Sequence, residues 1–136
     1  MISKLLKKDK KGFTLMEMLI VVAIIAIIVA IAIPTFSNAL TKAKVAADKA
    51  NVRAYYAEVA AKYMLAEDET AATAALGTAV TDATDLTVSG TAVKMQAGKY
   101  TVAIDTTTNH TWTITYTANS DNQNKYPPLT LTLNIG

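Results

Sequence analysis

The distribution of apolar and polar residues predicts a membrane-spanning helix near the N-terminus. In residues 13–33, only Thr14 and Glu17 interrupt an otherwise apolar run. A helix of about 20 apolar residues is long enough to cross the hydrocarbon layer of a membrane. Pro34 follows directly, and proline removes an amide donor and crowds the carbonyl one turn back. We therefore expect the helix to kink at Pro34.

A second helical pattern extends over residues 35–66, which contain no glycine and no further proline. Two stripes recur at steps of three and four residues on opposite sides of this helix. Because an ordinary surface helix buries a single stripe, we expect the Val/Tyr stripe to pack on the helix's own domain. That stripe contains Val45, Val52, Tyr56, Val59 and Tyr63.

The opposite stripe consists mainly of alanine, and two interpretations of it stay open. Small side chains permit close approach by other helices, but alanine is also the best helix former and needs no other reason to be there. The stripe comprises Phe36, Leu40, Ala43, Ala47, Ala50, Ala54, Ala57, Ala61 and Met64.

Apolar and polar residues alternate in residues 100–105, 111–117 and 129–135, with threonine at most of the polar positions. This period of two predicts three strands, each with one buried face. The fold class is therefore α+β: a long N-terminal helix, kinked at Pro34, whose outer half packs on a small antiparallel sheet of three to four strands.

The segment between the helix and these strands is rich in Ala, Thr and Gly. We predict a short helix over residues 69–76, ended by Gly77. Residues 78–90 are expected to form an exposed connector with one short strand near residues 86–88. The chain thus divides into a leader (1–12), an apolar helix half (13–34), an amphipathic helix half (35–66), a connecting loop (67–98) and the sheet (99–136).

Charge is concentrated at the N-terminus. The whole chain has 13 basic and 11 acidic side chains, and the first twelve residues hold five lysines and one aspartate. The rest of the chain therefore has 8 basic and 10 acidic side chains. No basic patch outside this segment argues for nucleic-acid binding. Positive charge beside an apolar helix keeps that end in the cytoplasm, which places the residues after 33 outside. The chain has no cysteine, which excludes disulfides and thiolate chemistry.

The charged segment and apolar run also fit a secretory signal peptide cut after Ala32, the end of an Ala-x-Ala motif. Three observations argue against this interpretation. The apolar run is longer than the apolar region of a usual signal peptide, Glu17 interrupts that run, and the helical pattern continues beyond the cut. A carboxylate in hydrocarbon costs about 2.5 to 3.5 kcal/mol. The alternative cut lies between Gly12 and Phe13.

The sequence Lys-Lys-Gly-Phe-Thr-Leu-Met-Glu of residues 10–17, followed by the apolar run and Pro34, closely resembles the class III leader and N-terminal helix of type IV pilins. The resemblance covers about the first 40 residues. It implies cleavage after Gly12, N-methylation of Phe13 and filament assembly in which Glu17 pairs with the Phe13 amine of a neighbouring subunit. Independently of the resemblance, the first interpretation of the alanine stripe predicts that neighbouring subunits pack against Ala43, Ala47, Ala50, Ala54 and Ala57.

The partners implied by the resemblance are further copies of the chain in a helical homopolymer, a prepilin peptidase, a membrane platform protein and an assembly ATPase. The protein is expected in the cytoplasmic membrane as a prepilin and then in an extracellular filament. Glu17 favours a major pilin, and the missing cysteines favour a Gram-positive, clostridial-type source. A pseudopilin of type II secretion or DNA uptake is the alternative within the family. A signal-anchored extracellular binding domain is the alternative outside it.

Little in the sequence indicates other chemistry. Asn119, Asp121 and Gln123 are spaced by two and could hold calcium, although the loop lacks the glycine and terminal acid of a helix-flanked calcium loop. His110, the only histidine, has no accompanying nucleophile or base motif and is expected in a solvated turn. No enzymatic activity is predicted. Whether a filament would serve adhesion, twitching, biofilm formation or DNA uptake is not encoded in a recognisable motif.

Overall fold

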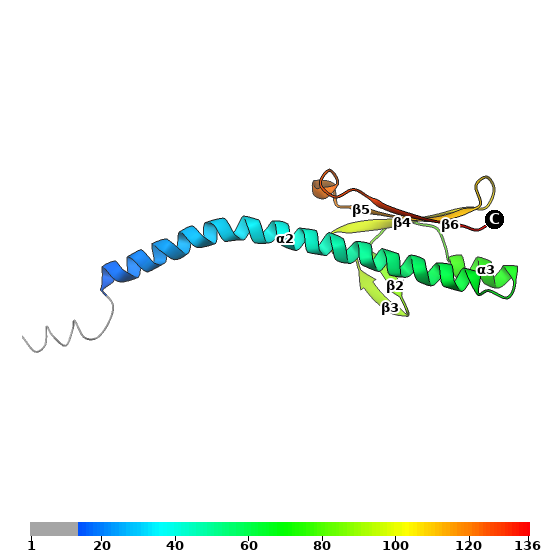
Figure 1. The fold of residues 1–136 in the computed structure, drawn as a ribbon, viewed down its shortest axis with the longest axis horizontal. Helices are drawn as coiled ribbons and strands as arrows, with labels where there is room; N and C mark the ends of the chain where they lie inside the picture. The colour runs from blue at the N-terminus through cyan, green and yellow to red at the C-terminus, as the bar shows by residue number, and fades with distance from the viewer. Residues whose placement is uncertain (1–13) are drawn as a thin grey trace, which may run out of the picture. The chain divides into compact units, whose positions relative to one another are not determined.

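The computed structural model describes residues 14–136 and is dominated by one long helix (Figure 1). Helix α2 (Leu15–Met64) has 50 residues. The chain divides into two compact units, Met1–Leu40 and Thr41–Gly136, so α2 contributes to both.

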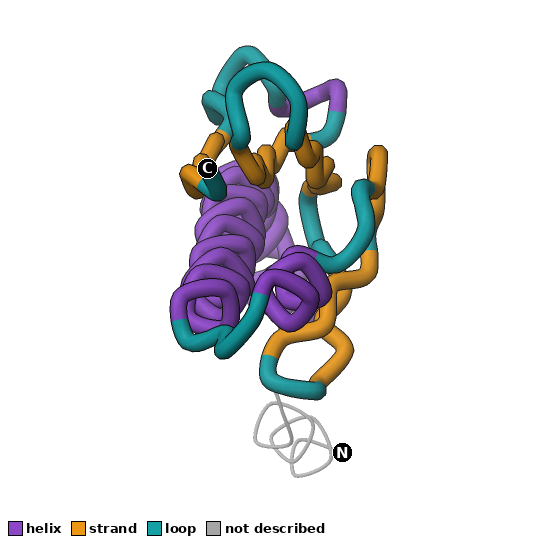
Figure 2. Tube along the Cα trace, turned by 90° about the vertical axis from the view of Figure 1, so that its right-hand side faces the viewer, coloured by secondary structure: helices purple, strands orange, loops and turns teal. Residues whose placement is uncertain are grey.

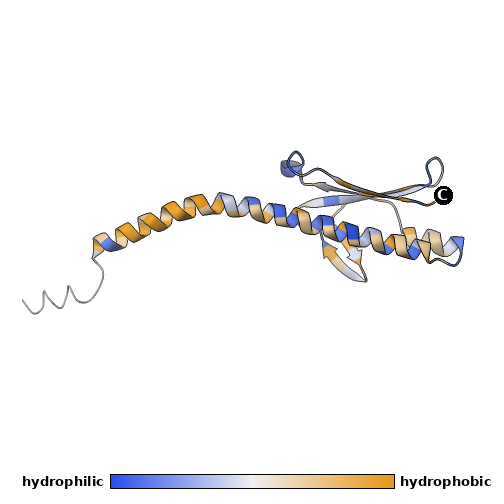
Figure 3. Cartoon of the chain, viewed as in Figure 1, coloured by the Kyte–Doolittle hydropathy of each residue, from blue (hydrophilic) through white to orange (hydrophobic). Residues whose placement is uncertain are grey.

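The described part of the first unit is an apolar helix that no other residue in 14–136 covers. All side chains of residues 14–40 are exposed, and Figure 3 shows this part of α2 as almost continuously hydrophobic. By length and composition α2 is able to cross a membrane. The helix continues through Pro34, and the Thr35 hydroxyl donates a hydrogen bond of 3.1 Å to the Ile31 carbonyl.

The second unit is built on a four-stranded antiparallel sheet in the order β1-β4-β5-β6. Figure 2 shows the sheet lying along one side of the outer half of α2. A separate two-stranded hairpin joins β2 to β3. The strands are β1 (Val80–Ala83), β2 (Asp85–Val88), β3 (Thr91–Lys94), β4 (Gly98–Asp105), β5 (Thr111–Ala118) and β6 (Leu129–Asn134).

The core lies between α2 and the inner face of the sheet, and Trp112 is its centre. The Trp112 indole is fully buried and donates a hydrogen bond of 2.9 Å to the Leu76 carbonyl. The rings of Tyr55 and Tyr56 lie on it, each with its centroid 6.1 Å away. Val45, Val52 and Val59 are buried, whereas Tyr56 and Tyr63 pack against the core partly exposed. The predicted Val/Tyr stripe is therefore confirmed as the face that covers the sheet.

The three predicted strands are confirmed as β4, β5 and β6. The predicted short helix is α3 (Glu69–Leu76); Asp68 caps its start by accepting from the Ala71 amide at 2.7 Å, and Gly77 ends it with a φ of 68°. A positive φ at this position favours glycine because no Cβ opposes it.

The short strand predicted near residues 86–88 is confirmed as β2, but the prediction that the rest of residues 78–90 forms an exposed connector was wrong. The segment and the residues after it also form β1 and β3, and Leu86 in β2 is 1% exposed. Strands β1 and β3 have only four residues each, too few for alternation to stand out among Thr, Ala and Asp. Their pairing also depends on distant partners, since Val80 in β1 aligns with Val102 in β4.

Candidate functional site

The first turn of α2 contains a reciprocal pair of hydrogen bonds between Thr14 and Glu17. The Glu17 carboxylate accepts from the Thr14 amide at 3.0 Å, and the Thr14 hydroxyl accepts from the Glu17 amide at 3.3 Å. This is the arrangement of a capping box, in which a threonine N-cap and a glutamate three residues later satisfy each other's free amides. The negative charge also lies at the positive end of the helix dipole. Glu17 is thereby fixed beside the first residue of the helix.

Gly12 and Phe13, the residues predicted at the cleavage and methylation site, lie outside the described residues. The structure therefore places only one side of the predicted amine–carboxylate pair. Oε2 of Glu17 accepts from Thr14, and no hydrogen bond to Oε1 is found among residues 14–136. A carboxylate has about four lone-pair positions, so Glu17 can accept further donors without losing its cap.

Around Glu17 the surface is apolar. Leu15, Met16, Met18 and Leu19 are all more than half exposed, so any covering element would place the carboxylate in apolar surroundings. A buried charge is costly unless it is paired. Where hydrocarbon or protein covers this helix, the carboxylate must therefore either meet a cation or take up a proton.

The alanine stripe is exposed along the outer half of α2, opposite the face that covers the sheet. Val45, Val52 and Val59 are buried, whereas all five alanines predicted to pack between subunits are exposed: Ala43, Ala47, Ala50, Ala54 and Ala57. Their exposure leaves room for another helix. The packing itself stays a prediction.

One buried polar residue was not predicted from the sequence: Asp48 is completely buried in the core. Its carboxylate accepts from the backbone amides of Gln96 at 2.8 Å and Ala97 at 2.7 Å, and from the Tyr116 hydroxyl at 3.1 Å. The pKa of the Tyr116 hydroxyl is raised above its ordinary value of 10.0, mainly because the group is buried and also because the negative charge of Asp48 lies beside it. Asp48 thus ties α2 to the link between β3 and β4.

The close approach of Tyr116 to this link requires a glycine at position 98. A Cβ added to Gly98 would lie 2.5 Å from the Tyr116 hydroxyl oxygen and 2.5 Å from the Thr117 carbonyl oxygen. Such distances are sterically forbidden. A signal for Asp48 existed in the sequence, because it lies three residues after Val45 and four before Val52, on the buried stripe.

A second row of α2 side chains, spaced by seven residues, donates hydrogen bonds to backbone carbonyls of β6 and its flanking residues. Since β6 is an edge strand, these donors satisfy carbonyls that would otherwise be open to another strand. The three bonds are Lys49 Nζ to the Pro127 oxygen at 2.7 Å, Tyr56 Oη to the Thr132 oxygen at 3.1 Å and Tyr63 Oη to the Ile135 oxygen at 2.8 Å.

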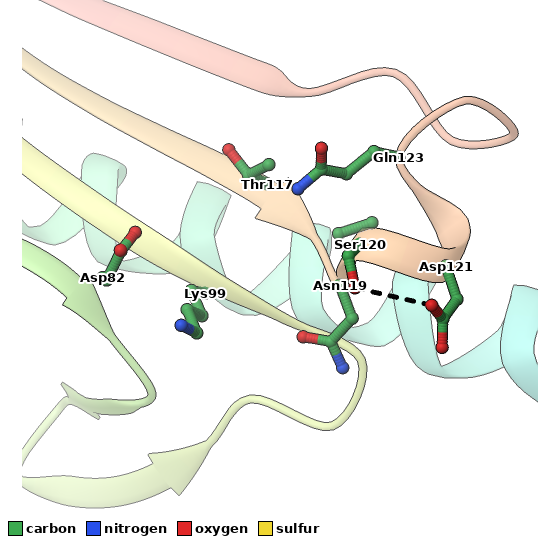
Figure 4. A pocket seen from close by; sticks show the side chains of 8 residues that line it. Asp82, Lys99, Thr117, Asn119, Ser120, Asp121 and Gln123 are labelled. Carbon is green, nitrogen blue, oxygen red and sulfur yellow. Dashed lines mark hydrogen bonds between the residues drawn. The ribbon is translucent and has the colours of Figure 1, made fainter.

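The three residues considered for calcium line an open cavity of about 510 Å³ beside the end of β5 (Figure 4). Asp121 lies in the short helix η1 (Ser120–Asn122), Asn119 comes directly before this helix, and Gln123 comes directly after it. In Figure 4 the Gln123 side chain extends toward Thr117, away from the Asp121 carboxylate. Residues 14–136 contain no group of three or more His, Asp or Glu side chains suited to a metal. Calcium binding here stays an untested prediction.

His110 is exposed at the β4–β5 turn with a positive φ of 47°, as expected for a solvated turn residue. Its carbonyl accepts a hydrogen bond of 2.8 Å from the Ile135 amide. The nearby cavity that it lines, of about 290 Å³, also contains Glu69 and Tyr63. None of these contacts arranges a nucleophile with a base.

Comparisons with known proteins concern the N-terminal segment. A family model described as the prokaryotic N-terminal methylation motif matches residues 7–33. The chain is 50% identical over 46 residues to the type IV major pilin protein PilA of Myxococcus xanthus, covering 34% of this chain and 21% of that protein. It is 52% identical over 40 residues to the type IV major fimbrial protein FimA of Dichelobacter nodosus, covering 29% of this chain and 26% of that protein. No solved structure matches the chain significantly.

The aligned segment spans about a quarter or less of the length of these curated relatives. Within that segment, the resemblance to type IV pilins seen in the sequence is confirmed. The long N-terminal helix with its four-stranded antiparallel sheet is consistent with the pilin α+β fold. The similar proteins are named as structural components of pili and fimbriae, not as enzymes.

Proposed function

We propose that this chain, a type IV pilin by its N-terminal motif and its fold, is the structural subunit of a type IV pilus. In this proposal the leader is cut after Gly12, the new amine of Phe13 is methylated, and the processed subunit joins a helical surface filament through α2. The motif in residues 7–33 supports the processing steps. The relatives' names support the filament.

The observation that carries the proposal is the position of Glu17 in an uncovered apolar helix. Within residues 14–136, nothing covers the side chains of residues 14–40, all of which are exposed. A membrane can cover the apolar residues, but it leaves the Glu17 carboxylate without a counter-charge. Stacked copies of the same helix can cover the apolar surface and also provide an amine.

Cleavage after Gly12 would create an amine at Phe13, with an ordinary pKa near 8 and therefore mostly charged at neutral pH. In a filament, the amine of an incoming subunit would lie against Glu17 of the subunit already in place. A buried ion pair contributes little net stability, but it is well suited to fix register because a wrong offset leaves both charges unpaired. The pair would therefore determine how far each helix advances.

The proposal implies two locations and four partners. Before assembly, the apolar half of α2 lies in the cytoplasmic membrane with the leader lysines on the cytoplasmic side. A prepilin peptidase removes the leader there, and a membrane platform protein and an assembly ATPase extrude the subunits into an extracellular homopolymer. The remaining partner is the chain itself.

Intact-mass measurement of the exported protein tests the processing step. We expect an N-terminus at Phe13 with one added methyl group. A mature N-terminus at Ile33 would contradict the proposal and support a signal peptide, whereas an unprocessed N-terminus would support an anchored binding domain. Electron microscopy of sheared cell surfaces then separates long pili from the short fibres of a pseudopilin.

A further inference from the structure

Exposed positive charge lies along one side of the outer half of α2. Lys42, Lys49 and Arg53 follow one another at steps of seven and four, so they share one side of the helix. Lys42 and Arg53 are exposed, and Lys49 is half-buried beside Pro127. Among residues 14–136 the only ion pair joins Lys62 to Glu58, so no carboxylate of the described chain neutralises these three cations.

The cations border the alanine stripe. Arg53 lies three residues after Ala50 and four before Ala57, which makes both alanines its direct neighbours on the helix surface. Side chains this small leave a shallow apolar strip beside the charged row. We call Lys42, Lys49, Arg53, Ala50 and Ala57 the basic face.

The opposite chemistry occurs at the end of the same helix. Met64, the last residue of α2, and Leu65, which follows it, are 73% and 80% exposed. Glu67, Asp68 and Glu69 follow after Ala66 and are all exposed. Only Asp68 has a local task, because its carboxylate caps α3 through the Ala71 amide. We call Met64, Leu65, Glu67 and Glu69 the acidic corner: two large apolar side chains bordered by two free carboxylates.

The two surfaces are complementary in both charge and size. Large apolar side chains with carboxylates beside them match a strip of small residues with cations beside it. Within one molecule they cannot meet, because Met64 lies 11 residues beyond Arg53 and 22 beyond Lys42 on one continuous helix, about 16 and 33 Å along its axis.

We propose that the acidic corner of one copy docks on the basic face of a second, parallel copy. This inference rests on the proposed function, which supplies the parallel orientation because every copy begins at the same side of the membrane. The axial offset would lie between about 16 and 33 Å. A contact between two different patches of the same chain does not close on itself when the copies are displaced along an axis, so it propagates into a filament.

Charge reversal in the full-length chain tests this contact. Arg53→Glu and Glu67→Lys should each reduce the sheared-filament yield about tenfold or more, because each places like charges together at the contact. The double variant should return the yield to within about twofold of the unchanged chain, since it restores an opposite-charge pair. Lys99→Glu, an exposed reversal on β4, is the matched control and should assemble normally. The membrane-bound amount of each variant is measured alongside.

The possible outcomes are separable. Normal filaments from both single variants would overturn the docking contact and leave the proposed function intact. Loss with Arg53→Glu alone, without rescue in the double variant, would overturn it in favour of an anionic lipid or another partner at the basic face. Absence of filaments and of Phe13 methylation in the unchanged chain would instead contradict the proposed function.

Discussion

The Tyr116 hydroxyl donates a hydrogen bond of 3.1 Å to the Asp48 carboxylate in the interior of the globular unit. Asp48 comes from α2 and Tyr116 from the central strand β5, so the bond joins the helix directly to the sheet. The same carboxylate also accepts from two backbone amides of the β3–β4 link. One buried acid therefore holds three parts of the fold in register.

We expect Asp48→Ala to destabilise the protein by about 3 to 5 kcal/mol, because it leaves the buried amide of Ala97, the amide of Gln96 and the Tyr116 hydroxyl without an acceptor. Asp48→Asn, which keeps one acceptor oxygen, should cost clearly less. Denaturant unfolding of the purified full chain in detergent, followed by the fluorescence of the single Trp112, measures both. Equal stability of the alanine variant and the unchanged protein would contradict the assigned role.

The raised pKa of Tyr116 predicts a loss of stability in alkali. Because the folded state holds this proton more tightly than the unfolded state, the contribution is complete below pH 10 and declines as the pH rises above that value. Tyr116→Phe removes the group, so its melting temperature should fall less between pH 9 and pH 11. Burial also raises the pKa of Tyr55 and Tyr100, so the slope should decrease rather than vanish. An unchanged slope would refute the assignment.

At the opposite end of the pH scale, Asp105 orders the β4–β5 turn. Backbone amides of Thr108, Thr107 and Asn109 donate to its carboxylate and lower its pKa from 3.8 to about 2. The contribution is therefore complete above pH 4 and is lost as the pH falls toward 2. The amide NMR signals of Thr107 and Thr108 should titrate with a midpoint near 2. A midpoint near 4 would show that the turn does not hold the carboxylate.

The sequence predicted those parts of the fold in which a local pattern repeats. Alternation over six or more residues located β4, β5 and β6, and the period of the Val/Tyr stripe identified the covering face of α2. Strands β1 and β3 have four residues each, and β1 owes its position to pairing with β4, so neither left a readable local signal.

The site was predictable to a similar degree. The position of Glu17 in the apolar run was evident from the sequence, and its assembly role was implied by the resemblance to type IV pilins. The hydrogen bonds between Thr14 and Glu17 became visible only in the structure. Asp48 was missed because polar residues are expected on exposed helix faces, and its three partners are distant in the sequence. The docking surfaces likewise became visible only once the exposure of Met64 and Leu65 was known.

The alanine stripe predicts a separation between stability and assembly. Ala57 is exposed, so Ala57→Gln should change the free energy of unfolding by less than about 0.5 kcal/mol. If the stripe lies between subunits, the same variant should reduce filament yield strongly because the longer side chain prevents close helix approach. Ala103→Gln, the same substitution at an exposed position of β4, is a control for side-chain size. Full assembly of the Ala57 variant would mean that alanine serves only helix formation.

The central claim is that Glu17 is retained for assembly and not for the helix or the membrane. Thr14→Ala provides the comparison, because it removes one hydrogen bond of the cap at a cost of about 0.5 to 2 kcal/mol while leaving the carboxylate in place. Glu17→Val removes the carboxylate and relieves about 2.5 to 3.5 kcal/mol of insertion cost. Both variants should therefore reach the membrane.

The most direct measurement is the ratio of sheared filament to membrane-bound subunit for Glu17→Val, quantified beside Thr14→Ala and the unchanged chain. We predict that Glu17→Val accumulates in the membrane at least as well as the unchanged chain and yields few or no filaments, while Thr14→Ala still assembles. Normal filaments from Glu17→Val would contradict the account.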